Sequence, residues 1–377
     1  MNGELVNKPK QLSKCMNEFV VNKVTNLRGN IPPCRKDPLD RVRNLMQSRN
    51  CSFSLRFAHP DDVSKVINNL KSSKSSGLDD IDSYVLKLAC EEVTPAITHI
   101  VNLSIGQSYF PTFWKTSKVI PLFKKGDSTI PKNYRPVSLL PITSKILERV
   151  VYEQLVKYLE DNCILHPSHH GFRKNHSTTT ALLEMYSSWV EAYEQDKVTA
   201  VVLLDMSAAF DLVVKTILIE KLKLYGLDSS SSAWMESYLS SRSQQVFLDG
   251  ELSDVLPVTE VAHNHPPADD YLAFWNTYCS NCGGISCFAD DSSFSKSNKD
   301  TQSLNEELRV KYSEISEYMA SNMLVLKSDK THLLVMASAT QHRLYDNYEV
   351  ELITGLETIL PQNHKRLLGS EFSSNFK

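Results

Sequence analysis

The sequence predicts an α+β fold in which helices and strands are mixed along the chain, and three observations support that prediction. Apolar residues recur at helical spacing in several stretches, as at Val63, Val66, Ile67 and Leu70. Continuous apolar runs such as residues 199–204 are typical of strands that are buried on both faces. Of the 377 residues, 41% are hydrophobic and 23% are charged, which are ordinary globular values and exclude a disordered or fibrous chain.

The first half of the chain should begin with a loosely attached lead-in over residues 1–58, because this segment is polar and contains the break Ile31-Pro32-Pro33. After it we expect, in order, a helix that starts from His59 and ends before the turn-rich residues 72–80, a helix over 85–107, two short strands within 114–140, and helices over 144–162 and 177–194. The second of these helices should bury an apolar face that includes Leu86, Ile97, Ile100, Val101 and Leu103.

The second half alternates strands and helices. Residues 199–204 predict a buried strand that ends at Asp205, and a helix over 214–224 should stop at Gly226, a plausible C-cap. The remaining elements are expected to be strands at 244–248 and 285–289, a helix over 303–322 and a strand near 333–336.

The charge balance excludes a strongly basic nucleic-acid coat protein, since 41 Lys and Arg face 44 Asp and Glu for a net charge of −3. One segment departs from this balance: between Lys115 and Arg135 six Lys or Arg accompany a single acid, a local charge of +5. Two interpretations stay open at this point. The segment is either a strand edge protected by lysines or a surface that faces phosphates.

We expect an intracellular protein, in the nucleus or the cytoplasm and not secreted. The polar start carries no secretory signal, and no apolar run reaches about 18 residues, so no membrane partner is expected. The eight cysteines are scattered and form no disulfide framework, as is usual in a reducing compartment.

Carboxylates follow two of the predicted strands. Asp205 comes directly after one apolar run, and Asp290 and Asp291 come directly after another. Each alone has a simpler explanation, an N-cap for Asp205 and a polar turn for the pair. If the strands that end at Asp205 and Asp290 lie side by side, the carboxylates converge, and such oxygen ligands suit Mg²⁺. Two ions about 3.5–4 Å apart are the arrangement used in phosphoryl transfer.

Two other acidic or cysteine-containing patterns carry less weight. Ala268-Asp269-Asp270 repeats the tripeptide around Asp290, but Pro266-Pro267 precedes it, so no strand presents it. Cys279 and Cys282 have CxxC spacing, yet a structural zinc site needs four ligands at regular spacing, so we expect no zinc.

These motifs resemble those of the reverse transcriptases of LINE-type, non-LTR retrotransposons of the Jockey-like kind. Residues 200–213, AVVLLDMSAAFDLV, resemble motif A, and Phe288-Ala289-Asp290-Asp291 resembles motif C. Further blocks follow in the family's order: Ser76-Gly77-Leu78-Asp79, Trp114-Lys115, residues 133–140 with Lys145-Ile146-Leu147-Glu148-Arg149, His170-Gly171-Phe172-Arg173 with His176-Ser177-Thr178, Ser328-Asp329-Lys330-Thr331, and Lys365-Arg366-Leu367-Leu368-Gly369. Ordered blocks between residues 60 and 370 make the resemblance specific.

The resemblance implies a right-hand polymerase fold, with fingers over 59–198, a palm over 199–345 built on an antiparallel sheet with helices on one side, and a palm end over 346–377 with a truncated or absent thumb. It implies two Mg²⁺ ions, with Mn²⁺ as an alternative, and as partners an RNA template, a DNA primer and dNTPs. The roles it implies are these: Asp205, Asp290 and Asp291 as metal ligands, Lys330 as proton donor to pyrophosphate, Arg135 as triphosphate contact and Phe210 as the side chain that excludes a ribose 2′-OH. Lys118, Lys124 and Lys125 would bind nucleic acid. Phe210 as plain core and Lys330 as a solvated turn lysine remain open alternatives.

The segment 258–284 departs from the family. The expected motif B, a Gly-Val-Pro-Gln-Gly-Ser run followed by an apolar helix, is replaced by residues such as His263, His265, Pro266 and Pro267. This motif normally packs under the nucleotide base and the template. We therefore predict metal binding but little or no templated synthesis by this chain.

Three functions compete on this sequence. An RNA-directed DNA polymerase domain of a larger element protein, expected to be inactive through the loss of motif B, ranks first. A non-catalytic nucleic-acid-binding remnant of such a domain ranks second. An unrelated Mg²⁺ nuclease or phosphotransferase ranks last, because it would not need the blocks around Arg135.

Overall fold

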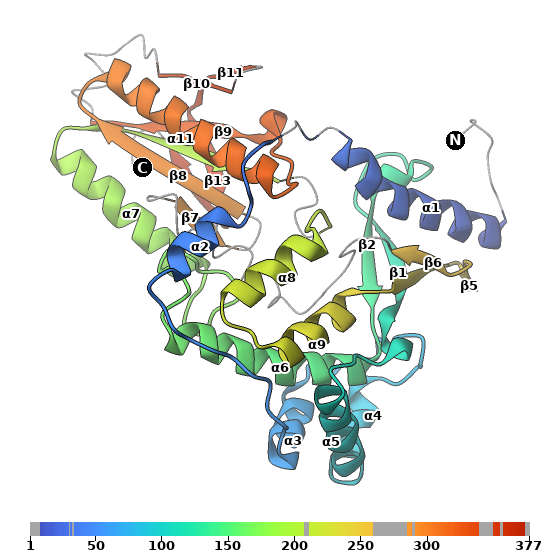
Figure 1. Cartoon of the computed structure of the whole chain (residues 1–377). Helices are drawn as coiled ribbons and strands as arrows, with labels where there is room; N and C mark the ends of the chain where they lie inside the picture. The colour runs from blue at the N-terminus through green and yellow to red at the C-terminus, as the bar shows by residue number, and fades with distance from the viewer. Residues whose placement is uncertain are drawn as a thin grey trace. The chain divides into compact units, whose positions relative to one another are not determined.

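The computed structural model describes residues 8–29, 31, 34–206, 211–258, 285–288, 291–338, 350–354 and 357–373. The chain forms two compact units (Figure 1). The first contains α1 (Pro9–Arg28), α3 (Pro60–Asn69), α4 (Ser83–Leu88), α5 (Cys90–Gly106), α6 (Ile142–Asp161), α8 (Lys215–Leu224), α9 (Ser229–Leu239) and strands β1, β2 and β4–β6. The second contains α7 (Thr178–Glu194), α11 (Thr301–Ser321), β3 and β7–β14; α2 (Asp40–Met46) straddles the division.

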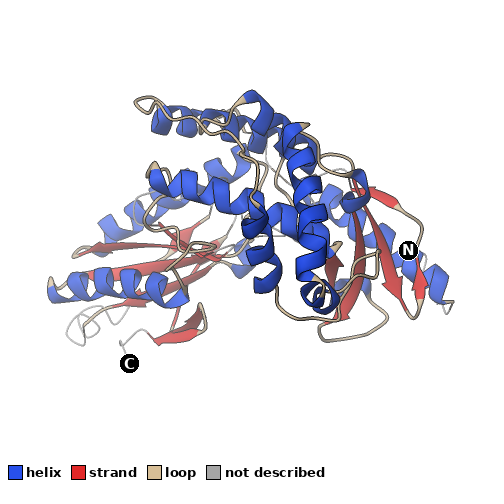
Figure 2. Cartoon of the chain, turned by 90° about the horizontal axis from the view of Figure 1, so that it is seen from below, coloured by secondary structure: helices blue, strands red, loops and turns tan. Residues whose placement is uncertain are grey.

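Strands and helices are mixed in both units, as the α+β prediction requires (Figure 2). The first unit holds a five-stranded sheet of order β2-β1-β4-β5, with β6 also paired to β4. Its strands are β1 (Thr116–Phe123), β2 (Tyr134–Leu139), β4 (Arg242–Leu248), β5 (Glu251–Leu252) and β6 (Leu256–Val258). The strands expected within 114–140 and at 244–248 are therefore confirmed, and β1 and β2 form an antiparallel pair.

Helix α1 is packed and not loosely attached, which corrects the expectation for residues 1–58. Met16 and Val20 are buried, and Met16 belongs to a core cluster with Val119 of β1 and Val246 of β4. Asn17 donates to the hydroxyl of Ser253 at 2.9 Å. The polar composition misled the prediction because a helix needs only one buried stripe, and here that stripe is partly polar and satisfied by hydrogen bonds.

The helix predicted over 85–107 is two helices, α4 and α5, and only part of its expected apolar face is buried. Leu86, Ile97 and Val101 are buried, whereas Ile100 and Leu103 are exposed. The structure explains the glycine within the block Ser76–Asp79. A Cβ at Gly77 would lie 2.6 Å from the nitrogen of Pro141, so only glycine fits. Gly226 likewise has φ +103 and lies against the carbonyl oxygen of Cys51, as a helix-ending glycine should.

The second unit is built on a five-stranded sheet of order β12-β9-β3-β8-β7. Its strands are β3 (Val198–Leu204), β7 (Ile285–Phe288), β8 (Asp291–Asn298), β9 (His332–Met336) and β12 (Pro361–Gln362). The pairs β3·β8, β3·β9 and β7·β8 are antiparallel, and only the short β12 runs parallel to its neighbour. Two small hairpins, β10 (Leu352–Ile353) with β11 (Thr358–Ile359) and β13 (His364–Leu367) with β14 (Ser370–Ser373), complete the unit.

Helices cover both faces of this sheet, which corrects the expectation of helices on one side. Val201 and Leu203 pack with Met185 and Trp189 of α7. Successive side chains of a strand point to opposite faces, so Val202 and its neighbour Phe294 face the other side, where α11 packs along β8. Figure 1 shows α7 and α11 on the two sides of β8.

Every residue of β3 is buried, so the prediction of a doubly buried strand is confirmed. Truncation of one fully buried neighbour, such as Leu333→Ala, should lower the free energy of unfolding by about 2–5 kcal/mol.

Among the described residues, no helix is both long enough and apolar enough to span a bilayer.

Candidate functional site

Asp205 lies at the carboxyl end of β3, the central strand of the second sheet. Its side chain is 39% exposed, in contrast to the strand before it. The N-cap explanation finds no support in the described residues, because the next helix there begins at Lys215 and its N-cap is Val214. Strand β3 is therefore buried along its length, and the residue that follows it places a carboxylate at the surface.

Asp291 opens β8, directly beyond the last pair that β8 forms with β3. That pair is Leu204 with Ser292, so Asp205 and Asp291 are the next residues along the two strands. An antiparallel register continued by one residue would set them opposite each other. The predicted adjacency was wrong in one respect: β7, which precedes Asp290, does not neighbour β3, because the return strand β8 lies between them. Asp290 and Phe210 lie outside the described residues.

Lys330 faces Asp205, and the structure brings together two residues that are far apart in the sequence. The Nζ of Lys330 donates to Oδ2 of Asp205 at 2.6 Å. The turn that carries the lysine is fixed in place, since the N–H of Lys327 donates to the carbonyl of Asp205 and Leu326 forms a β-bridge to Met206. The hydrogen bond to Asp205 raises the pKa of Lys330, so the ammonium is retained. The alternative of a purely solvated lysine therefore does not describe this contact.

A second cation contacts His332, two residues after Lys330, and was not among the predicted site residues. Lys365 of β13 contacts Nε2 of His332 at 2.8 Å through its Nζ. Burial, followed by the charge of Lys365, lowers the pKa of His332, so the imidazole is neutral at pH 7 and accepts the hydrogen bond. Two sequence positions could have pointed to this contact: His332 is two residues after Lys330, and Lys365 is the first residue of one of the blocks that resemble the family.

The carboxylates fit a hard divalent cation in kind, but the described residues do not complete a ligand set. No group of three or more His, Cys, Asp or Glu with metal-binding geometry occurs in the part of the chain that the structure describes. Asp205 and Asp291 supply oxygen donors of the type that Mg²⁺ prefers. The decoy at Asp269 and the cysteine pair at Cys279 lie outside the described ranges.

The basic segment forms the β1–β2 hairpin of the first unit. Lys124 and Lys125 follow β1 directly, and Arg135 of β2 pairs with Leu122. All three are exposed. The side chains of Lys125 and Arg135 form no hydrogen bond or ion pair with any described residue. The exposed Phe123 beside them contacts the ring of Tyr134, with centroids 5.4 Å apart.

Two cations of the same segment are used inside the protein. Lys115 is buried, donates to the carbonyl of Ser237 at 2.6 Å, and has its pKa lowered by burial. The side chain of Lys118 is 17% exposed; its Nζ lies 3.8 Å from Asp80 and 4.7 Å from the ring centroid of Phe247. Lys118 is thus less accessible to an external phosphate than Lys124 or Lys125.

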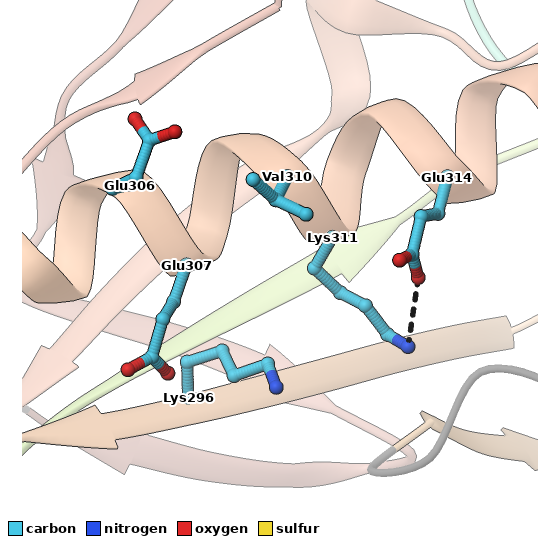
Figure 3. Close-up of a pocket in the computed structure, with 6 residues that line it drawn as sticks. All are labelled: Lys296, Glu306, Glu307, Val310, Lys311 and Glu314. Carbon is cyan, nitrogen blue, oxygen red and sulfur yellow. Dashed lines mark hydrogen bonds and ion pairs between the residues drawn. The ribbon is translucent and has the colours of Figure 1, made fainter.

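A cavity of about 270 Å³ lies between α11 and β8 and is shown in Figure 3. Its walls carry both signs of charge, from Lys296, Glu306, Glu307, Lys311 and Glu314. Several of these groups are already paired: Lys311 with Glu314 at 3.4 Å, and Glu306 with Arg309 at 2.7 Å. The cavity includes none of the predicted site residues, and Lys296 lies five positions along β8 from Asp291, about 16 Å at strand spacing.

Comparison with known proteins places this geometry in context. Residues 123–262 match the family model described as reverse transcriptase (RNA-dependent DNA polymerase). The chain is 26% identical over 247 residues to the probable RNA-directed DNA polymerase from transposon BS of Drosophila melanogaster, covering 64% of this chain and 26% of that protein. It is 29% identical over 208 residues to the RNA-directed DNA polymerase from mobile element jockey of the same organism, covering 55% and 23%.

A third relative is the probable RNA-directed DNA polymerase from transposon X-element of Drosophila melanogaster. The identity is 31% over 199 residues, which cover 52% of this chain and 22% of the relative. The chain therefore spans about a quarter of the length of each of these curated relatives.

Proposed function

We propose, from the reverse transcriptase domain that this chain carries and its homology to the polymerases of Drosophila non-LTR retrotransposons, that it is the RNA-directed DNA polymerase domain of such an element. In this proposal the fold is a right hand, with the β1–β2 hairpin in the fingers and the β3–β8 sheet in the palm. The expected partners are an RNA template, a DNA primer and dNTPs inside the cell, in the nucleus or the cytoplasm.

The observation that carries the proposal is the end of β3, where Asp205 faces Lys330 and, like Asp291 on β8, follows the last pair of the two strands, Leu204 with Ser292. Asp205 and Asp291, with Asp290 next in sequence, would hold Mg²⁺. A bound pair of such ions supplies stabilisation of the attacking and leaving oxygens in nucleotidyl transfer. Lys330 holds a proton at Nζ next to this point, as a donor to a departing pyrophosphate must.

The other residues of the site act on the substrates. Arg135 presents a planar donor fork from β2, which suits a triphosphate. Lys124 and Lys125 extend the same cationic hairpin toward a nucleic-acid backbone. Phe210, five positions after Asp205, is proposed by resemblance alone to exclude the ribose 2′-OH.

We propose further that templated synthesis by this chain is weak or absent, because residues 258–284 replace motif B. The family match ends at residue 262, inside that segment, which supports the replacement. Positioning contributes much of the catalysis of phosphoryl transfer, and a misplacement of about 1 Å can cost on the order of 100-fold.

The experiment is primer extension on an RNA template by two chains, the natural one and one in which a Gly-Val-Pro-Gln-Gly-Ser segment with its apolar helix replaces 258–284. The restored chain should extend the primer, and Asp290→Asn in it should abolish extension. Vigorous synthesis by the natural chain would contradict the inactivity. A restored chain that binds no divalent cation would contradict the metal site.

A second function, a non-catalytic nucleic-acid-binding remnant, is favoured by the exposed hairpin cations, which require no intact metal site. Binding of duplex or hybrid nucleic acid by the Asp205→Asn variant with unchanged affinity, together with an inactive restored chain, would select this function over the first.

A further inference from the structure

The block around His170 has no role in the proposed function, yet the structure gives it a definite place beside the second sheet. Residues 168–170 run parallel to β7, the end strand of that sheet. The N–H of Cys287 donates to the carbonyl of Ser168 at 3.0 Å, and the N–H of His170 donates to the carbonyl of Cys287 at 2.9 Å. The segment thus caps the free edge of a strand that has only four residues.

Four side chains hold this segment against α7, and we call them the His170 clamp: Ser168, His170, Thr180 and Glu184. His170 contacts Oε2 of Glu184 through Nε2 at 2.5 Å and Oγ1 of Thr180 through Nδ1 at 3.1 Å. Ser168 donates to the other oxygen of Glu184 at 2.6 Å. Both carboxylate oxygens of Glu184 are therefore engaged by the two residues whose backbone grips Cys287.

The geometry of the clamp is further fixed at both of its ends. Ser177 caps α7 by accepting from the N–H of Thr180, so the helix start is determined by the same block. Arg173 donates to the carbonyls of His166 and His169 at 2.9 and 3.1 Å and closes the turn that precedes the helix. The His170 side of these contacts is buried, with the residue 5% exposed, whereas the side chain of Glu184 is 45% exposed.

From this arrangement we infer that the His170 clamp positions the β7–β8 strand pair, and with it Asp291, for the reaction proposed above. A four-residue edge strand that has a partner on one side only is expected to open readily. The clamp supplies the second partner and fixes it to α7, whose Met185 also receives the hydroxyl of Ser293 in β8. These are positioning residues, since none of them contacts Asp205 or Asp291 in the described structure. The positioning of Asp291 for the reaction rests on the proposed function, whereas the positioning of the strand pair does not.

The test is hydrogen exchange of the peptide that contains residues 285–288 in the full chain, combined with Mn²⁺ binding. Glu184→Ala leaves a helix-compatible residue at a position whose side chain is 45% exposed, so folding should persist. It should accelerate exchange of this peptide about tenfold or more, and weaken Mn²⁺ binding. Glu191→Ala, at an exposed position of the same helix, should change neither.

A conservative variant separates positioning from simple loss of packing. Glu184→Gln still accepts from Ser168, so its exchange rate should lie between those of the natural chain and Glu184→Ala. Unchanged exchange in Glu184→Ala would overturn the clamp. Faster exchange in Glu184→Ala, in a chain whose natural form binds no Mn²⁺, would support the clamp and overturn the proposed function.

Discussion

Two regions of this protein carry the charges on which its proposed chemistry depends. In one the charge is paired inside the protein, and in the other it is exposed to solvent. At the end of β3 the carboxylate of Asp205 already has an internal counter-ion, Lys330, at 2.6 Å. On the β1–β2 hairpin the side chains of Lys125 and Arg135 are exposed and meet no described partner. The carboxylate of the first region is paired within the protein, whereas the cations of the second face solvent, where an external anion can reach them.

The difference teaches that local charge alone does not identify a binding surface. Lys115 and Lys118 belong to the same +5 segment as Lys125, yet one is buried against a carbonyl and the other lies over an aromatic ring. Only the side chains beyond the covered part of β1 remain available to a phosphate. Changing the charges of each region separately tests this difference.

The largest effect is expected at the carboxylates. In the chain with motif B restored, Asp205→Asn should lower primer extension by more than 100-fold, since loss of an outer partner of a metal ligand alone typically costs about 10–100-fold. The rate of extension at saturating Mg²⁺ is the measurement. Asp249→Asn, in a turn at φ 50 that asparagine tolerates, is the control and should leave the rate unchanged. Equal rates for both variants would remove Asp205 from the site.

The hairpin should show the next largest effect. The double variant Lys124→Glu/Lys125→Glu should weaken nucleic-acid binding on the order of tenfold and reduce the magnitude of the log–log salt slope by about 1.8, two phosphates at about 0.9 each. Titration at several salt concentrations measures both. Lys65→Glu/Lys71→Glu, exposed positions in and just after α3, changes the net charge equally and should have little effect. A control that weakens binding as strongly would show that only the total charge matters.

A smaller effect should follow from removing the internal counter-ion. Lys330→Gln frees Asp205, so Mn²⁺ should bind about two- to fivefold more tightly, the range of an exposed ion pair worth up to about 1 kcal/mol. Lys327→Gln in the same turn should leave the affinity unchanged. Weaker Mn²⁺ binding by Lys330→Gln would mean that the lysine supports the site and does not compete for it.

The smallest effect concerns pH and the His170 clamp. The hydrogen bond from His170 lowers the pKa of Glu184, so its stabilisation is present above the ordinary glutamate pKa of about 4.3 and is lost as the pH falls through the lower, folded value. Because Glu184 is half-exposed, Glu184→Gln should lower the free energy of unfolding at pH 7 by less than about 1 kcal/mol, with the difference vanishing in acid. Denaturant unfolding measured as a pH series from 7 downward follows this loss, and a difference between the two chains that does not depend on pH would exclude the charge as its source.

Local pattern predicted most elements of the fold. Short apolar runs placed the strands β3 and β7, strand-type residues before a turn placed β4, and apolar residues at helical spacing placed α6, α7 and α11, because burial of a strand or a helix leaves such patterns in the sequence itself. Pattern failed for α1, whose buried stripe includes Ser13 and Asn17, and for Ile100 and Leu103, which are apolar and exposed. For α1 the deciding partners come from distant parts of the chain, Val119, Val246 and Ser253.

The amino-acid sequence was enough to predict a carboxylate after the buried strand at Asp205, acidic residues after the strand at 285–289, and the resemblance to a polymerase family. The position of β8 between those strands, the ion pair of Lys330 with Asp205, and the contact of Glu184 with the segment beside Cys287 became known from the folded chain alone. The cause is the range of the interactions. Periodicity reflects burial along one element, whereas strand order and ion pairs depend on which distant elements the closed chain brings together.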